Sequence, residues 1–229
     1  MSQNRSSAVM QQRSEPHDSL DDFPTPPWST RALCEWLLGQ AAGGLTLDDD
    51  PALIALTARE PAANRGYMAR VLAEYFGRIE AADVHDYGVG YPVRDYLFGP
   101  LPSMVDWTIT NPPFRLAEQF IQRALATSRL GVAVIVRMAF LEGVGRYRDL
   151  FKAFPPSDIL QFTERVVMHK GRLSAKGSTA TAYCWIVWRK DVVGDAPRFH
   201  WIGPCRRRLE RDGDYPAEDV AEAVEGALL

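Results

Sequence analysis

The chain has 229 residues, of which 46% are hydrophobic, and a formal net charge of −3 at pH 7. This length and composition predict one globular α/β domain with a full core, and the charge balance excludes a globally basic nucleic-acid binder. No apolar run approaches the roughly 20 residues of a membrane span, and the three separated cysteines have no metal-ligand spacing, so we expect a cytoplasmic protein with reduced thiols.

The N-terminal residues 1–20 are rich in serine, glutamine, asparagine and charge, which predicts a disordered tail before a single domain at 21–229. A proline-rich, extended segment follows at 23–28. Ser29 or Thr30 is expected to cap a helix that runs to about Leu38. A packed N-terminal arm without a functional role is an equal alternative for the proline-rich segment.

The next expected elements are a strand at Ala52–Ala58, a turn at Arg59–Met68 and a helix at Ala69–Phe76. A strand, a small-residue turn and a helix can cradle a nucleotide, because the ligand approaches the backbone and the helix N-terminus offers N–H groups. Only Gly66 remains of a dinucleotide G-x-G-x-x-G pattern. Asn64 tolerates a positive φ better than most other residues.

A second strand is expected at Arg78–Ala82, and it ends in Asp83. A carboxylate at this position, about 20 residues after the first turn, is placed to accept hydrogen bonds from two ribose hydroxyls. A capping or surface aspartate is the alternative. Val93–Phe98 is expected to form a short third strand or turn.

The central strand, Val105–Thr110, runs into Asn111-Pro112-Pro113-Phe114 and then into a helix that ends near Ala126. The prolines end the strand because they have no N–H to donate, and ligands bind at this edge of open α/β sheets. The Asn111 side-chain oxygen and the Pro112 carbonyl are two acceptors that suit an –NH2 group, and Phe114 offers a ring for stacking. The alternative is a strand-ending turn with a core phenylalanine.

Beyond this turn we expect strands at Gly131–Val136, Ile159–Met168, Thr179–Arg189 and Phe199–Ile202, helices at Tyr147–Phe154 and Ala217–Leu228, and a flexible loop at 169–178. Residues 137–190 hold ten Lys or Arg against four Asp or Glu. The loops in this window follow the strands at Gly131–Val136 and Ile159–Met168, so their cations are expected at the same edge as Asn111. There they would neutralise phosphates, and the residues expected to do so are Arg137, Arg146, Lys170, Arg172 and Lys176. A solvated surface is the alternative, and it is favoured for Arg206–Arg208.

The Asn-Pro-Pro-Phe turn resembles the catalytic motif of the S-adenosyl-L-methionine-dependent N6-adenine methyltransferases, and the resemblance extends from Thr25 to about Arg189. It implies a class I methyltransferase, Rossmann-like α/β fold: a seven-stranded, mostly parallel sheet with one antiparallel strand and helices on both faces. It also implies the cofactor S-adenosyl-L-methionine, contacted by Thr25, Pro26, Glu60, Pro61, Ala62, Gly66, Asp83, Asp95, Tyr96 and Asn111. The implied catalytic residues are Asn111, Pro112, Pro113 and Phe114.

The implied reaction is methylation of the N6 amine of adenine in DNA, with the base flipped onto Phe114. DNA is the expected partner, without a membrane or an obligate protein partner, and the loops at 138–178 are expected to face it. RNA adenine and protein-glutamine methyltransferases share the turn, and the basic loops favour a nucleic acid. A catalytically silent binding module remains a second class, favoured by Asn64 in a cofactor loop with one glycine.

Overall fold

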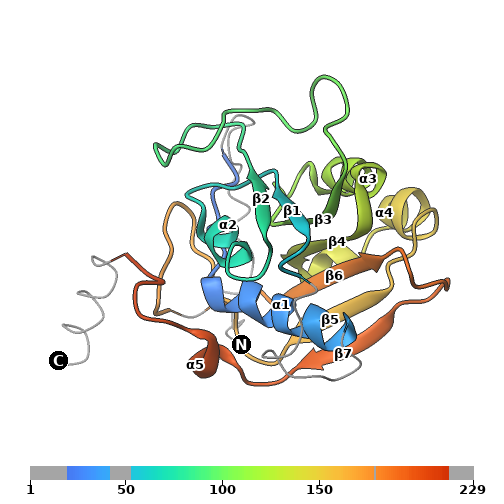
Figure 1. The fold of residues 1–229 in the computed structure, drawn as a ribbon. Coiled ribbons are helices and arrows are strands. Elements are labelled where there is room, and N and C mark those ends of the chain that lie inside the picture. Colours follow the sequence, from blue (N-terminus) through green and yellow to red (C-terminus); the bar gives the residue numbers. More distant parts are fainter. Residues whose placement is uncertain (1–19, 42–52, 178, 217–229) are drawn as a thin grey trace, which may run out of the picture.

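The structure is a computed structural model that describes residues 20–41, 53–177 and 179–216, drawn as coloured ribbon in Figure 1. The tail predicted at residues 1–20, apart from Leu20, and the helix predicted at 217–228 lie outside the described residues. Within these ranges, no helix combines the length and apolar character that a bilayer crossing requires.

Seven strands form one sheet in the order β2-β1-β3-β4-β6-β5-β7. Their bounds are β1 (Thr57–Glu60), β2 (Arg78–Ala81), β3 (Val105–Thr110), β4 (Ser128–Arg137), β5 (Asp158–Phe162), β6 (Tyr183–Arg189) and β7 (Arg198–Ile202). Strand β6 is antiparallel to both of its neighbours, and every other pair is parallel. This confirms the predicted seven-stranded, mostly parallel sheet with one antiparallel strand.

Helices cover both faces of this sheet, as predicted (Figure 1). The α-helices are α1 (Pro27–Ala41), α2 (Tyr67–Leu72), α3 (Ala117–Thr127), α4 (Val144–Arg146) and α5 (Arg206–Leu209), with a 3-10 turn at Met138–Leu141 and a π turn at Tyr147–Phe151. Strand β4 alternates between two cores: Ala133 and Ile135 pack with α1, α2 and α5, whereas Val132, Val134 and Val136 pack with α3. Burial on both faces explains the uniformly apolar sequence of its residues 131–136.

Several element boundaries in the N-terminal half differ from the sequence prediction, and α2 spans Tyr67–Leu72 rather than Ala69–Phe76. Strand β1 begins at Thr57 because residues 53–55 form a turn, and it extends through Glu60 rather than ending at Ala58. Helix α1 begins at Pro27, which suits a first helical position because proline has no N–H to leave unpaired. Ser29 therefore lies inside the first turn, where its hydroxyl donates to the Pro26 carbonyl at 2.7 Å, and it does not cap the helix.

Of the two alternatives predicted for Val93–Phe98, a strand or a turn, the structure has the turn. The segment's only strand-like pairing is a single bridge between Asp83 and Val93. The seventh strand of the sheet is instead β7, the predicted edge strand, which pairs in parallel with β5. Asp158 of β5 anchors it, since this buried carboxylate pairs with Arg198 at 3.0 Å and with His200 at 2.9 Å. The strands predicted to reach Met168 and to start at Thr179 are shorter, ending at Phe162 and starting at Tyr183.

Candidate active site

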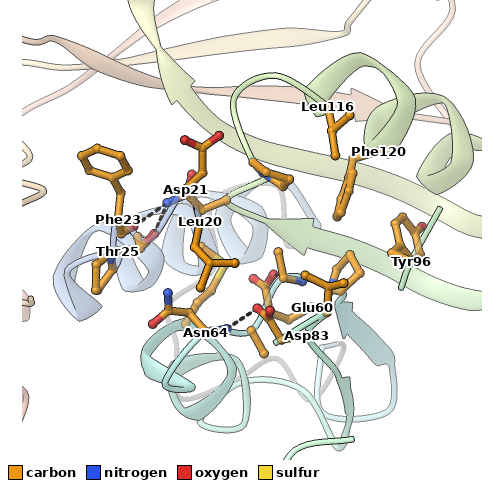
Figure 2. Close-up of a pocket in the computed structure, with 18 of the residues that line it drawn as sticks. Leu20, Asp21, Phe23, Thr25, Glu60, Asn64, Asp83, Tyr96, Leu116 and Phe120 are labelled. Carbon is orange, nitrogen blue, oxygen red and sulfur yellow. Dashed lines mark hydrogen bonds between the residues drawn. The ribbon is translucent and has the colours of Figure 1, made fainter. Parts of the chain in front are cut away.

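A cavity of about 420 Å³ lies where the chain leaves the carboxyl ends of β1, β2 and β3. This volume lies within the range of small-molecule sites. Figure 2 shows Glu60 and Asp83 close together in the cavity, with Leu116, Phe120 and Tyr96 on one side and Leu20, Asp21, Phe23 and Thr25 on another. The cavity therefore sits at the edge of the sheet predicted to bind ligands.

Most of the residues predicted to form the site line this one cavity. The lining includes Thr25, Glu60, Pro61, Ala62, Asp83, Asp95, Tyr96, Asn111 and Pro113. Four predicted residues belong to the same segments without lining it, namely Pro26, Gly66, Pro112 and Phe114. The small-residue turn after β1 and the Asn-Pro-Pro-Phe turn after β3 thus open into the same space.

Glu60, the last residue of β1, is a buried carboxylate with one unpaired oxygen. Its Oε1 accepts hydrogen bonds from the Thr110 hydroxyl at 2.6 Å and from the Ala62 N–H at 3.1 Å. Its Oε2 has no hydrogen-bond partner among the described residues, although the side chain is only 1% exposed. Burial, only partly opposed by these two hydrogen bonds, raises the pKa of Glu60 to about 8. An unpaired buried acceptor in a cavity wall is costly unless a ligand donates to it.

Asp83 and the turn at residues 62–66 are fixed to one another. The Asp83 carboxylate accepts hydrogen bonds from the backbone N–H groups of Asn64 at 2.8 Å and of His85 at 3.0 Å. Asn64 has φ +52° and Gly66 has φ +78°, so the turn uses two left-handed residues before α2 begins. The tolerance of asparagine for this conformation explains how the turn forms with one glycine.

Gly66 also admits a neighbouring ring that a larger residue would exclude. A Cβ at this position would lie 2.4 Å from the Tyr91 ring, and φ +78° is itself unfavourable for alanine. We expect Gly66→Ala to lower the free energy of unfolding by about 1–3 kcal/mol, measured by urea denaturation. Gly99→Ala is the matched control, since Gly99 has φ +79° with open space around its Cβ position. Equal losses in the two variants would show that the contact with Tyr91 is unimportant.

The Asn111 side chain is held in a single orientation by the N-terminal arm. Its Nδ2 donates to the Phe23 carbonyl at 2.9 Å and to the Thr25 hydroxyl at 3.0 Å. A carbonyl can only accept, so the amide nitrogen faces the arm and Oδ1 faces away from it. Neither Asn111 Oδ1 nor the Pro112 carbonyl accepts a hydrogen bond from any other residue in the described part of the chain.

Residues 20–25 contribute contacts that the sequence did not predict. Asp21 accepts from the Phe114 N–H at 2.8 Å, which fixes the turn after β3. Asp22 accepts from Asn64 Nδ2 at 2.7 Å, from Arg65 Nη1 at 2.8 Å and, through its carbonyl, from the Gly171 N–H at 2.8 Å. The arm therefore joins both turns and the 169–177 loop. Two adjacent aspartates beside a polar tail gave no pattern from which this role could be read.

Phe114 lies beside the cavity with its ring in contact with two other side chains. Its centroid is 5.2 Å from that of Phe23, with a 43° angle between the rings. The guanidinium carbon of Arg137 lies 4.1 Å from the centre of the Phe114 ring. The ring predicted to receive a stacked base is thus covered by a cation in this structure.

The other predicted nucleic-acid-binding residues divide into two groups. Arg146 is held within the protein: it pairs with Glu118 at 3.1 Å, donates to the Phe140 carbonyl at 2.7 Å and covers the Phe140 ring. Lys170, Arg172 and Lys176 are exposed in the loop that follows Met168, whose sulfur lies 3.8 Å from Asn111 Nδ2. This loop is therefore next to the Asn111 turn. In the second basic cluster, Arg206 and Arg208 form ion pairs with Glu210 and Glu35.

Comparison by sequence returned no match among protein-family models or among curated proteins. Solved structures do match the fold, at low sequence identity. A protein of Listeria monocytogenes described as a class I S-adenosylmethionine-dependent methyltransferase gives a TM-score of 0.56 at 12% identity, over 88% of this chain and 69% of that one.

Two further structures with the same fold carry different descriptions. The methyltransferase subunit of a type I restriction-modification system from Streptococcus thermophilus gives a TM-score of 0.56 at 11% identity, over 91% of this chain and 53% of that one. A Pyrococcus horikoshii protein described as an RNA methyltransferase gives 0.53 at 17% identity, over 77% of this chain and 91% of that one. The chain thus has the class I methyltransferase fold and spans about half the length of the restriction-modification subunit.

Proposed function

We propose that this chain is an S-adenosyl-L-methionine-dependent methyltransferase that methylates the N6 amine of adenine in DNA. The observation that carries this proposal is the opening of two turns into one cavity: the Glu60 turn, suited to the cofactor, and the Asn111 turn, suited to an amine. The shared fold of the methyltransferase structures supports it.

The residues of the cavity fit this cofactor in size and in charge. Four carboxylates line it against one arginine, which favours a ligand with cationic groups: Asp21, Glu60, Asp83 and Asp95, with Arg115. Glu60 Oε2, buried without a partner, is the acceptor we assign to the cofactor ammonium. Asp83 retains lone pairs for ribose hydroxyls, and Tyr96 and Phe120 offer rings beside them. When bound, the cofactor supplies a methyl group on a sulfonium.

The Asn111 turn would bind and activate the acceptor amine. Asn111 Oδ1 and the Pro112 carbonyl can each accept one hydrogen of an –NH2 group, since neither has another partner among the described residues. Accepting both hydrogens returns electron density to a nitrogen that is otherwise delocalised into its ring. Preorganised acceptors of this kind act without reorganisation during the reaction. The amine would react through its own lone pair, and the proton that the methylated nitrogen then gives up would pass to water.

DNA is the acceptor we favour because the amine site is adjacent to exposed cations. Flipping a base costs a few kcal/mol, and stacking on an aromatic ring contributes about 1–3 kcal/mol in return. The 169–177 loop, which carries Lys170, Arg172 and Lys176, follows Met168 beside Asn111, so phosphates flanking a flipped adenine would pass near this loop. The fold likeness to a restriction-modification methyltransferase subunit agrees with this choice.

We expect a variant with Lys170, Arg172 and Lys176 all changed to alanine to bind DNA more weakly and with less dependence on salt. Each lost phosphate contact should reduce the slope of log K against log salt by about 0.9. Fluorescence anisotropy with a labelled duplex, repeated at salt concentrations from about 50 to about 200 mM, measures this slope. The control is Arg78→Ala with Arg129→Ala, because these exposed arginines lie at or next to the first residues of β2 and β4, at the opposite edge. Equal slopes for both variants would contradict the assignment.

The proposal is tested by incubating the protein with labelled cofactor and separate pools of DNA, RNA and protein. We expect N6-methyladenine in the DNA. Label in RNA would favour an RNA enzyme, which the Pyrococcus horikoshii likeness also allows, and label on glutamine would favour a protein enzyme. Calorimetry with the cofactor separates a silent module, since absence of transfer with cofactor binding intact would indicate binding without chemistry.

A further inference from the structure

The position of Arg137 over Phe114 follows from the order of the strands. Strands β3 and β4 are parallel neighbours, with Thr110 opposite Val134, so the chain leaves both at the same edge of the sheet. Phe114 follows β3 and Arg137 is the last residue of β4. The guanidinium carbon lies 4.1 Å from the Phe114 centroid and 5.6 Å from the Phe23 centroid, so it covers a pair of neighbouring rings.

Arg137 differs from Arg146, which makes a similar stack on Phe140. The Arg146 guanidinium lies 4.1 Å from the Phe140 centroid but is also fixed by Glu118 and by the Phe140 carbonyl. Arg137 is exposed, and its side chain forms a hydrogen bond with the neutral Tyr183 side chain, but no carboxylate of the described residues pairs with it. Its contact with Phe114 is therefore one that another planar group can replace without separating an ion pair.

We propose that Arg137 occupies the stacking position of the acceptor base on Phe114 until that base binds. In the empty site its planar guanidinium covers the Phe114 ring. When adenine arrives, the guanidinium leaves the ring and pairs with a phosphate of the same strand. This inference rests on the proposed function, because it requires a base that stacks on Phe114.

Two physical arguments support the exchange. Guanidinium and purine groups are both flat and both stack on aromatic faces, and at an exposed site the base–aromatic stack is the stronger of the two. The displaced guanidinium keeps its charge at neutral pH and presents a donor fork that matches phosphate. Occupying the ring before substrate binds also shields an apolar surface next to a polar cavity. Arg137 can therefore cover the Phe114 ring in the empty site and bind a DNA phosphate in the occupied site.

The direct test is NMR of the arginine side chains in protein labelled with 15N, with Arg137→Lys used to assign the signal. Stacking on Phe114 should shift the Arg137 Hε signal upfield in the free protein. We expect a downfield shift when an adenine-containing duplex is added with S-adenosylhomocysteine. A signal that remains upfield while anisotropy shows bound DNA would overturn the inference. Absence of DNA binding would instead contradict the proposed function.

Kinetics give an independent test. We expect Arg137→Ala to raise KM for DNA by about tenfold and to reduce the salt slope of binding by about one, with the larger effect on KM rather than on kcat. Arg129→Ala is the matched control because Arg129 is an exposed arginine at the other end of β4. Unchanged KM and salt slope in the Arg137 variant, with methyl transfer intact, would show that the cation is not delivered to a phosphate.

Discussion

Asn111→Ala is expected to lower the methyl-transfer turnover by at least about 10²-fold. The change removes an acceptor whose direction is already set, because Nδ2 is held by the Phe23 carbonyl at 2.9 Å and by the Thr25 hydroxyl at 3.0 Å. Without Oδ1, the amine keeps only the Pro112 carbonyl as a partner. Single-turnover kinetics, with the protein in excess over duplex DNA and the cofactor saturating, measures the effect on the transfer step.

Two measurements separate this effect from a loss of binding or of folding. Calorimetry of Asn111→Ala with the cofactor shows whether the cavity still binds it. Thr25→Ser retains a hydroxyl that accepts from Nδ2 and should stay close to wild-type turnover, whereas Thr25→Val removes it and should lower turnover by a smaller factor than Asn111→Ala. Near wild-type transfer by Asn111→Ala would refute the role of this turn.

Glu60→Gln is expected to weaken cofactor binding by about 10²-fold, as when one partner of a buried charge pair is lost. The amide keeps an oxygen for the Thr110 hydroxyl and the Ala62 N–H, so it replaces Oε2 with an –NH2 group facing the cavity. That group cannot accept from an ammonium. Calorimetry measures the affinity, and thermal unfolding at pH 7 measures the stability. The stability should not fall, because a carboxyl with a pKa of about 8 is already mostly protonated there.

The wild-type affinity for cofactor should also depend on pH. The pKa of Glu60 is raised to about 8 in the free protein, mainly by burial, and a bound ammonium would favour the charged form and lower this pKa. Binding would then release a proton. Affinity should rise about tenfold per pH unit as pH approaches 8 from below and level off above it. Glu60→Gln should abolish this slope, and a slope that persists in the variant would assign it to another group.

The sequence was sufficient to predict the strands from which the central cavity is built. Strand β3 is a short run of mostly apolar or β-branched residues that two prolines end, so its position follows from local chemistry alone. The same holds for β4, whose burial on both faces leaves no polar alternation. Glu60 and Asp83 lie at one edge because β1 and β2 are parallel and end together.

Other parts depend on contacts between residues distant in sequence, and local patterns did not reveal them. Val93–Phe98 has strand-like residues but pairs with the rest of the chain through only one bridge. The edge strand β7 was predicted, whereas the pairing of Asp158 with its residues Arg198 and His200 was not. The contact of Asp21 with the Phe114 N–H joins residues that are 93 positions apart in the sequence. The stacking of Arg137 on Phe114 likewise requires knowing that β3 and β4 are neighbours.

The late position of β6 in the chain has a consequence for biosynthesis. Residues 183–189 form an interior strand, so β4 and β5 each keep an open edge until this segment has left the ribosome. Open edges of apolar strands recruit other chains. We therefore expect translation products that stop before Tyr183 to aggregate, and we expect refolding of the intact chain to be slow, since its central pairing joins residues far apart.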